Sequence, residues 1–271
     1  MSAAQSYDRI AEFYDDDMAR NADGRDVGYY CEACVAARGG RPGHIPGHIP
    51  GHISGRILEL GCGTGRITLA LAGCGLDIVG VDLSLPMLRV LRRKAAGHPR
   101  PPLLAAMDMG RLGFAGPFAA ILCPFSALTY LIDEGERARA LAAIRAALAP
   151  QAPFLLDVFI PDPRVEARAG EEIFDYRRRL ADGTWLERRK RLVPDEYPGV
   201  NRIIRRYRFC DAAGRVLREV TTESRQRGYR PDELAAVLCR AGFRIAALSA
   251  DFTGQPLGPD SRTLVVAAGA A

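Results

Sequence analysis

The chain has 271 residues, with 37 lysines and arginines against 32 aspartates and glutamates, which leaves a net charge of +5. Hydrophobic residues make up 48% of the chain and charged residues 25%, a balance typical of a folded protein, so disorder as the dominant state is excluded. The mild positive charge does not by itself call for a nucleic-acid partner. The odd number of 7 cysteines and the absence of a secretory start predict a cytoplasmic protein without a disulfide framework.

Residues 1–55 form the first predicted unit. Residues 7–20 show the spacing of an amphipathic helix, and residues 27–37 form a second helical pattern. Residues 42–55 then read PGHIPGHIPGHISG, a Pro- and Gly-rich repeat that fits neither a regular helix nor a central strand. We expect the repeat to be a surface loop and residues 1–55 together to cap the functional site.

The sequence pattern changes at residue 56, after which short apolar runs alternate with helical patterns. Near-continuous apolar strands separated by helices indicate a parallel sheet that is covered on both faces. The predicted strands are residues 56–60, 77–81, 103–107, 119–123, 153–159, 244–252 and 262–268. The predicted helices are residues 65–72, 86–96, 134–148 and 231–241.

One uncharged segment, residues 112–132, is nominally long enough to cross a bilayer. It contains Pro117 and Pro124, which would break a helix in its middle. We therefore predict a buried strand followed by a loop, and no membrane contact.

Residues 170–228 interrupt the alternation of strands and helices. Apolar and polar residues alternate there, and Asp-Gly, Pro-Gly and Ala-Gly pairs separate the runs, which predicts an antiparallel meander of three or four strands. Because the sheet pattern resumes afterwards, an insertion is favoured over a separate domain. The sheet domain would then comprise residues 56–169 and 229–271.

The insertion is rich in arginine. One interpretation is a surface for an anionic substrate or a nucleic acid. The other is a solvated outer face whose arginine stems cover apolar surface. Acidic residues interleaved with the arginines favour the second interpretation.

The most specific signal is the sequence ELGCGTGR at residues 59–66, between a predicted strand and a predicted helix. Glycines there let the backbone approach a ligand, and the helix N-terminus offers free N–H groups. A dinucleotide site requires G-x-G-x-x-G, but Arg66 occupies the place of the third glycine. A Walker phosphate loop is also excluded, since no Gly-Lys-Ser/Thr follows.

This loop resembles the first motif of class I S-adenosylmethionine (SAM)-dependent methyltransferases. GVDLS at residues 80–84 and MDM at residues 107–109 resemble the second and third motifs of that family. The resemblance implies that Asp82 accepts hydrogen bonds from the ribose hydroxyls of SAM, that Asp108 accepts from the adenine amine and that Met109 packs on the ring. The implied cofactor-binding residues are Glu59, Gly61, Cys62, Gly63, Gly65, Asp82, Leu83, Met87, Asp108, Met109 and Cys123.

The end of the fourth predicted strand bears on the subclass. Its sequence CPFS at residues 123–126 lacks the Asn/Asp-Pro-Pro-aromatic motif of nucleobase amine methyltransferases. Its Cys-Pro order is also the reverse of the Pro-Cys nucleophile of RNA cytosine methyltransferases. Residues 125–131 and 157–163 instead resemble small-molecule methyltransferases with an inserted antiparallel sheet, such as amino-sugar N-methyltransferases and, more distantly, glycine N-methyltransferase.

The resemblance implies an α/β fold: a Rossmann-like, seven-stranded sheet whose last strand is antiparallel, with an antiparallel sub-sheet inserted before the last helix. Residues 170–228 would roof the acceptor pocket as a substrate lid. Tyr14 and Tyr130 are the candidate catalytic residues, and the family often has His where this chain has Tyr130. Tyrosine is a poor base at neutral pH, which favours a nitrogen acceptor.

Several alternatives remain open at this stage. They are an oxygen acceptor, an RNA or protein acceptor bound by the basic insertion, and a protein that holds SAM without turnover. We expect a small-molecule acceptor and no nucleic-acid partner, and we leave a homodimer open. Cys31 and Cys34 with the histidines of the repeat could suggest a metal site, but the repeat offers no fixed geometry, so we predict no metal.

Overall fold

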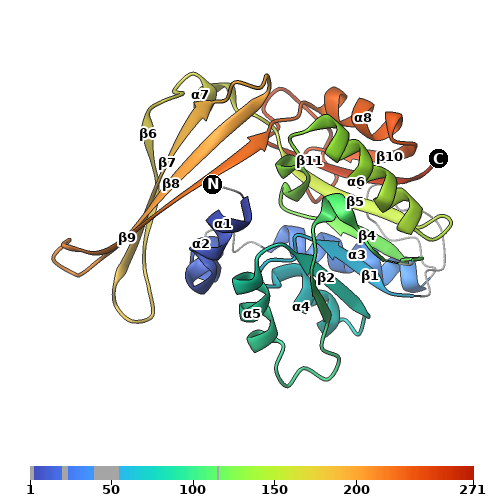
Figure 1. Cartoon of the computed structure of the whole chain (residues 1–271), viewed down its shortest axis with the longest axis horizontal. Helices are drawn as coiled ribbons and strands as arrows, with labels where there is room; N and C mark the ends of the chain where they lie inside the picture. The colour runs from blue at the N-terminus through green and yellow to red at the C-terminus, as the bar shows by residue number, and fades with distance from the viewer. Residues whose placement is uncertain (1–2, 20–23, 40–54, 115) are drawn as a thin grey trace.

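The predicted strands form one seven-stranded sheet in a computed structural model of the chain, which describes residues 3–19, 24–39, 55–114 and 116–271 (Figure 1). The strand order is β10-β11-β5-β4-β1-β2-β3. Only β11 runs antiparallel to its two neighbours, which confirms the predicted seven-stranded fold with its reversed last strand. The strands are β1 (Ile57–Leu60), β2 (Ile78–Asp82), β3 (Leu103–Ala106), β4 (Ala120–Cys123), β5 (Pro153–Phe159), β10 (Phe243–Ser249) and β11 (Thr263–Ala270).

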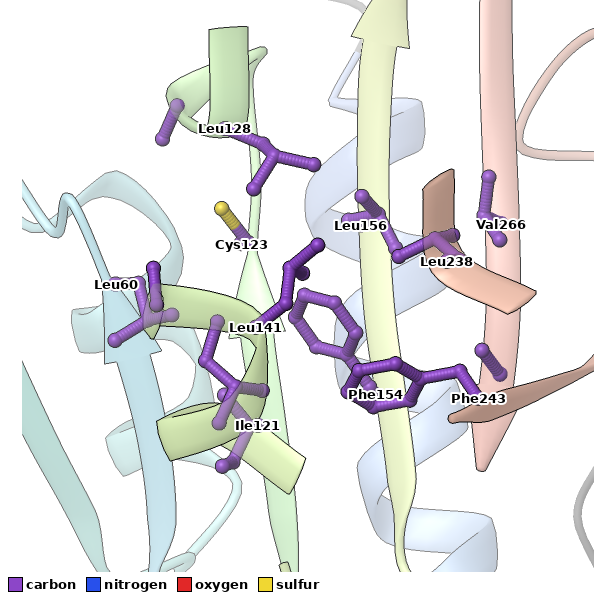
Figure 2. Packing of buried hydrophobic residues seen from close by; sticks show 14 of the residues in the cluster. Leu60, Ile121, Cys123, Leu128, Leu141, Phe154, Leu156, Leu238, Phe243 and Val266 are labelled. Atoms are coloured by element: carbon purple, nitrogen blue, oxygen red, sulfur yellow. The ribbon is translucent and has the colours of Figure 1, made fainter. Parts of the chain in front are cut away.

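Helices cover both faces of this sheet because its central strands are apolar on both sides. In β4, Ala120 and Leu122 face the helices α3 and α4, while Ile121 and Cys123 face α6 and α8. Figure 2 shows the second layer, where Leu141 packs among Ile121 and its neighbours. The helices are α3 (Arg25–Gly39), α4 (Arg66–Gly73), α5 (Leu85–Lys94), α6 (Glu134–Ala147) and α8 (Pro231–Arg240).

The uncharged segment 112–132 is a buried strand and a loop, as predicted. It contains β4 and the 3-10 helix η4 (Ala127–Tyr130). In the described part of the chain, no helix combines the length and apolar character that a membrane span requires.

The inserted segment is a separate four-stranded antiparallel sheet in the order β6-β7-β8-β9, which confirms the predicted meander. It follows the short helix α7 (Pro163–Glu166) and precedes α8. Its long strands stand beside the seven-stranded sheet in Figure 1. The strands are β6 (Glu172–Arg179), β7 (Trp185–Pro194), β8 (Val200–Cys210) and β9 (Val216–Arg227).

The single helix predicted for residues 7–20 is wrong. The chain forms three short pieces instead: α1 (Ala3–Asp8), the 3-10 helix η1 (Ala11–Phe13) and α2 (Tyr14–Met18). These pieces lie between the two sheets (Figure 1), where Phe13 packs edge-on against Tyr207 and Phe209 of β8. The segment packs against elements on several sides, and these contacts are stronger determinants of its structure than the periodicity that predicted one regular helix. Residues 40–54, which hold most of the predicted repeat loop, lie outside the described residues.

Candidate active site

A cavity lies at the carboxyl ends of β1, β2, β3 and β4, where the loops after parallel strands meet. Its empty space, part of which is open to solvent, is about 730 Å³. The N-terminal pieces α1 and α2 close it from the side of the inserted sheet. Its wall consists of Ala4, Tyr7, Tyr14, Gly61, Gly63, Asp82, Leu83, Met87, Met107, Met109, Pro124, Phe125, Ala127 and Tyr130.

Asp82 at the end of β2 holds the glycine loop in place. Its Oδ2 accepts from the Gly63 amide at 2.8 Å, and its Oδ1 accepts from the Ser84 amide at 2.8 Å. Burial raises the pKa of Asp82, while these backbone hydrogen bonds work in the opposite direction. A carboxylate has about four lone-pair sites, so Asp82 keeps capacity to accept from a ligand hydroxyl besides these backbone donors.

The glycine loop approaches the cavity with its backbone. Gly61 and Gly63 have φ of +70° and +54°, in the left-handed region that favours glycine. A Cβ at Gly61 would come within 3.1 Å of Ala127 Cβ. Thr64 ties the loop to the N-terminal segment, since its hydroxyl donates to Asp15 at 2.6 Å.

The rest of this cavity is largely apolar. Leu83 exposes 52% of its surface, and Met107 and Met109 are partly buried on the same wall. A carboxylate that can accept a hydrogen bond from a ligand hydroxyl, next to an apolar wall, fits the ribose and the base of a nucleoside. The residues therefore suit the nucleoside part of SAM.

The structure brings only some of the predicted cofactor-binding residues to the cavity wall. Those on the wall are Gly61, Gly63, Asp82, Leu83, Met87 and Met109. Those outside the wall are Glu59, Cys62, Gly65, Asp108 and Cys123. Cys62 and Cys123 are buried, and Asp108 accepts from the Gly110 amide at 2.8 Å. The motifs thus lie in the loops around this cavity, but only some of their residues line it.

Other residues on the wall were missed by the sequence analysis. Met107 and Phe125 belong to motifs that were noticed, so their neighbours in the sequence were the available signal. Tyr7 carried only a weak signal, the repeated Tyr-Asp pair at residues 7–8 and 14–15.

Glu59 lies beneath the loop rather than in the cavity. It is 2% exposed and accepts from the Thr68 hydroxyl at 2.5 Å. Burial raises the pKa of Glu59 from 4.5 to about 8. The folded protein therefore keeps a proton that the unfolded chain releases, and stability falls as the pH rises from about 4.5 to about 8.

Glu59→Gln removes this titration, so the variant should gain stability relative to the wild type between about pH 5 and about pH 9. Urea unfolding at both pH values measures the effect. Glu32→Gln, at an exposed site on α3, is the matched control and should show no such change. A stability difference that is equal at both pH values would show that Glu59 titrates normally.

A second cavity, with about 1420 Å³ of empty space, lies between the first cavity and the inserted sheet. Tyr7, Phe125 and Tyr130 line both cavities, so the two meet at these side chains. Of these two cavities, Tyr14 lines the first but not the second. A ligand in one cavity would therefore face a ligand in the other across a group of tyrosines.

The tyrosines at this junction form a hydrogen-bonded group. The hydroxyls of Tyr7 and Tyr130 are 2.7 Å apart, and Gln226 of β9 donates to Tyr130 at 2.6 Å. The rings of Tyr7 and Tyr14 meet edge to face at 5.8 Å. Burial raises the pKa of both Tyr7 and Tyr14, and neighbouring tyrosines add to the shift. Their phenols are thus neutral at physiological pH and can orient a ligand rather than act as strong bases.

The cysteines considered as metal ligands lie on α3, where Cys34 is buried and Cys31 partly so. Among the residues with described positions, no cluster of three His, Cys, Asp or Glu side chains could hold a metal ion. The repeat histidines His44, His48 and His52 fall outside those residues.

Comparisons with known proteins agree with this geometry. A family profile described as a methyltransferase domain matches residues 57–151. The Bacillus subtilis protein YqeM, named as a methyltransferase, is 26% identical over 214 residues, which cover 77% of this chain and 81% of YqeM. The CcbJ methyltransferase of Streptomyces caelestis has a TM-score of 0.75 at 25% identity, with 98% of each chain covered. SAM-bound CalS10 of Micromonospora echinaspora, an amino pentose methyltransferase, has a TM-score of 0.63 at 26% identity, covering 89% of this chain and 91% of its own.

Proposed function

Because the chain is a SAM-dependent methyltransferase with the class I fold, we propose that it transfers the methyl group to a nitrogen of a small molecule. The observation that carries the proposal is the meeting of the two cavities at Tyr7 and Tyr130. SAM supplies a methyl group that is already activated as a sulfonium. The protein mainly has to align the acceptor and exclude water, which can supply about 7–11 kcal/mol of the barrier.

The junction favours nitrogen over oxygen as the acceptor atom. A hydroxyl acceptor needs a general base, and the phenols of Tyr7 and Tyr14 are held neutral by burial, which raises their pKa. A neutral amine needs only orientation and later loss of a proton. The name of CalS10, an amino pentose methyltransferase, supports the same choice.

A macromolecular acceptor is less well supported, because the outer face of the inserted sheet is an ion-pair surface. Three of its arginines have carboxylate partners, which reduces the free positive charge that RNA would meet. The pairs are Arg202–Glu223, Arg206–Glu172 and Arg208–Glu219.

Replacing Asp82 with alanine is expected to weaken SAM binding by about 2 kcal/mol, since hydrogen bonds to charged groups contribute about 1.5–3 kcal/mol. The variant also frees the Gly63 amide that Asp82 holds. Isothermal calorimetry measures the change. Asp77→Ala, with a carboxylate that is 63% exposed near the other end of β2, serves as the control and should bind SAM normally. Equal affinities of both variants would refute the assignment of the first cavity to SAM.

Tyr130→Phe and Tyr14→Phe should each lower turnover by about tenfold to a hundredfold through lost orientation, with less effect on SAM affinity. Tyr197→Phe, at a 53% exposed site in the turn between β7 and β8, is the control. The pH–rate profile should rise toward the pKa of the acceptor amine and move with it when the acceptor is changed.

The same experiment separates the alternatives. A profile that stays fixed across acceptors and disappears in one tyrosine variant would indicate a dedicated base and an oxygen acceptor. SAM binding without any methylated product would indicate a protein that holds SAM without turnover.

A further inference from the structure

The two faces of β8 differ in how their charges are compensated. Because side chains alternate along a strand, Arg206 and Arg208 point to the outer face, where each has a carboxylate partner. Ile203, Arg205 and Tyr207 point inward and line the cavities beside the N-terminal segment. Arg205 is therefore the one arginine in this stretch of β8 that faces the interior.

Two other cations on the inner face, Arg188 and Lys190, are neutralised by carboxylates. Arg188 donates to Asp17 at 2.8 Å and also pairs with Asp175. Lys190 lies 3.4 Å from the second oxygen of Asp175. The negative charges of Asp17 and Asp175 thus balance the positive charges of Arg188 and Lys190. Neither carboxylate remains to balance a third cation.

Arg205 has no carboxylate partner within the described ranges of the chain. Its guanidinium donates to the Ser224 hydroxyl at 3.0 Å, which supplies no charge. In the strand register Lys190 lies directly opposite Arg205, and like charges at such a position destabilise a sheet. A partly buried cation in this setting is costly unless a ligand brings the opposite charge.

The position of Arg205 links it to the acceptor. The second cavity is lined by Arg205 together with Tyr7, Tyr130 and Gln226, the group at the junction with the first cavity. Near α7 the wall carries Asp162, which pairs with Arg164 and Arg262, and also Glu166 and Arg227. Arg227 has no carboxylate partner among the described residues either, but its guanidinium stacks on Tyr229 and its Nη1 donates to the Pro198 carbonyl. Arg205 is the uncompensated cation that acts electrostatically on Tyr7 and Tyr130.

We propose that the methyl acceptor carries an anionic oxygen group, a carboxylate or a phosphate, which binds to Arg205 while its amine lies at Tyr7 and Tyr130. This inference rests on the proposed function. The planar guanidinium suits either group, because it can donate two parallel hydrogen bonds to two oxygens.

Matched acceptor pairs test the inference. Each pair shares one amine with and without the anion: amino acids against their decarboxylated amines, and 2-aminoethyl phosphate against 2-aminoethanol. The wild type should methylate the anionic members with the higher kcat/KM, and the two sets distinguish carboxylate from phosphate. Arg205→Gln should raise KM for the anionic members by about tenfold to a hundredfold, with little effect on the neutral members. Arg205→Lys should restore part of the affinity, and Arg206→Gln, the outward neighbour, should behave as wild type.

A second measurement does not depend on choosing the correct amine. Labelled methyl transfer from SAM to a small-molecule extract should yield products that mass spectrometry shows to carry a carboxylate or a phosphate besides the methylated amine, and Arg205→Gln should deplete these products. The melting temperature of each variant with S-adenosylhomocysteine shows whether the fold and the cofactor site are intact. Labelled products that carry neither a carboxylate nor a phosphate, or products with such a group that are unaffected by Arg205→Gln, would overturn the inference alone. Absence of transfer to any small molecule, with cofactor binding intact, would overturn the proposed function and the inference together.

Discussion

Replacing Asp17 with alanine is expected to lower the free energy of unfolding by about 3–5 kcal/mol, because it leaves a buried charge without its partner. Asp17 is 3% exposed on α2 and accepts from Arg188 at 2.8 Å, from Tyr176 at 2.6 Å and from Tyr207 at 3.3 Å. These three partners all belong to the inserted sheet, so Asp17 fastens the N-terminal segment to it. Urea unfolding of the full chain measures the loss.

The same variant should also lower turnover, because α2 carries Tyr14 to the wall of the first cavity. The control is Asp16→Ala, the neighbouring and less buried carboxylate, which should stay within about 0.5 kcal/mol of the wild type. The double variant Asp17→Ala/Arg188→Met removes both charges and should be more stable than Asp17→Ala alone. An Asp17→Ala variant as stable as Asp16→Ala would show that this ion pair does not fasten the segment.

Gly65→Ala is expected to destabilise the protein by about 2–4 kcal/mol, through left-handed backbone strain and overpacking together. Gly65 has φ of +88°, and a Cβ there would lie 2.0 Å from Leu91 Cδ1 and 3.0 Å from its Cγ. Leu91 is fully buried on α5 against Cys62 and Leu88, so a shift of its side chain would disturb those contacts. Since Gly65 precedes α4 at the end of the glycine loop, SAM affinity should fall as well.

Two further glycines separate the causes. Gly63→Ala carries backbone strain at φ of +54°, but its Cβ would meet only Tyr14, at 4.0 Å, so the fold should suffer less than in Gly65→Ala. Gly73→Ala, in α4 with nothing within 4 Å of its Cβ, should be neutral or stabilising by up to about 1 kcal/mol. Thermal melts and SAM calorimetry on the three variants report stability and binding separately. Similar melting temperatures of Gly65→Ala and Gly73→Ala would contradict the packing argument.

The sequence alone determined the order and type of the main strands and helices from residue 56 to the C-terminus, although not short helices such as α7 and η4. A continuous apolar run such as residues 119–123 predicts a strand that is buried along its whole length. This signal is local, because it depends only on the residues of the run itself. The left-handed turns of the glycine loop and the carboxylate at the end of β2 are local as well. For this reason the motifs located the loops around the first cavity.

Tertiary structure decided which side chains in those loops face the cavity. Glu59 and Asp82 both belong to motifs, yet Glu59 turns into the core while Asp82 turns to the cavity wall. Strand alternation makes both directions available, and the layers of helices select one of them. The pattern of residues along the chain therefore does not predict the direction in which each of these side chains points.

Tertiary structure alone also decided which residues meet at the junction of the two cavities and which charges near it are paired. Tyr7 and Tyr130 are separated by 123 residues and Asp17 and Arg188 by 171, and no periodicity within either segment relates them. The helix predicted for residues 7–20 was wrong for the same reason, since contacts with β8 and α5 took precedence over local propensity. The arginine-rich insertion showed that charges were present, but only the pairing of strands showed that Arg206 is compensated and Arg205 is not. Compensation depends on distances in space, which the whole packed chain fixes and no single segment encodes.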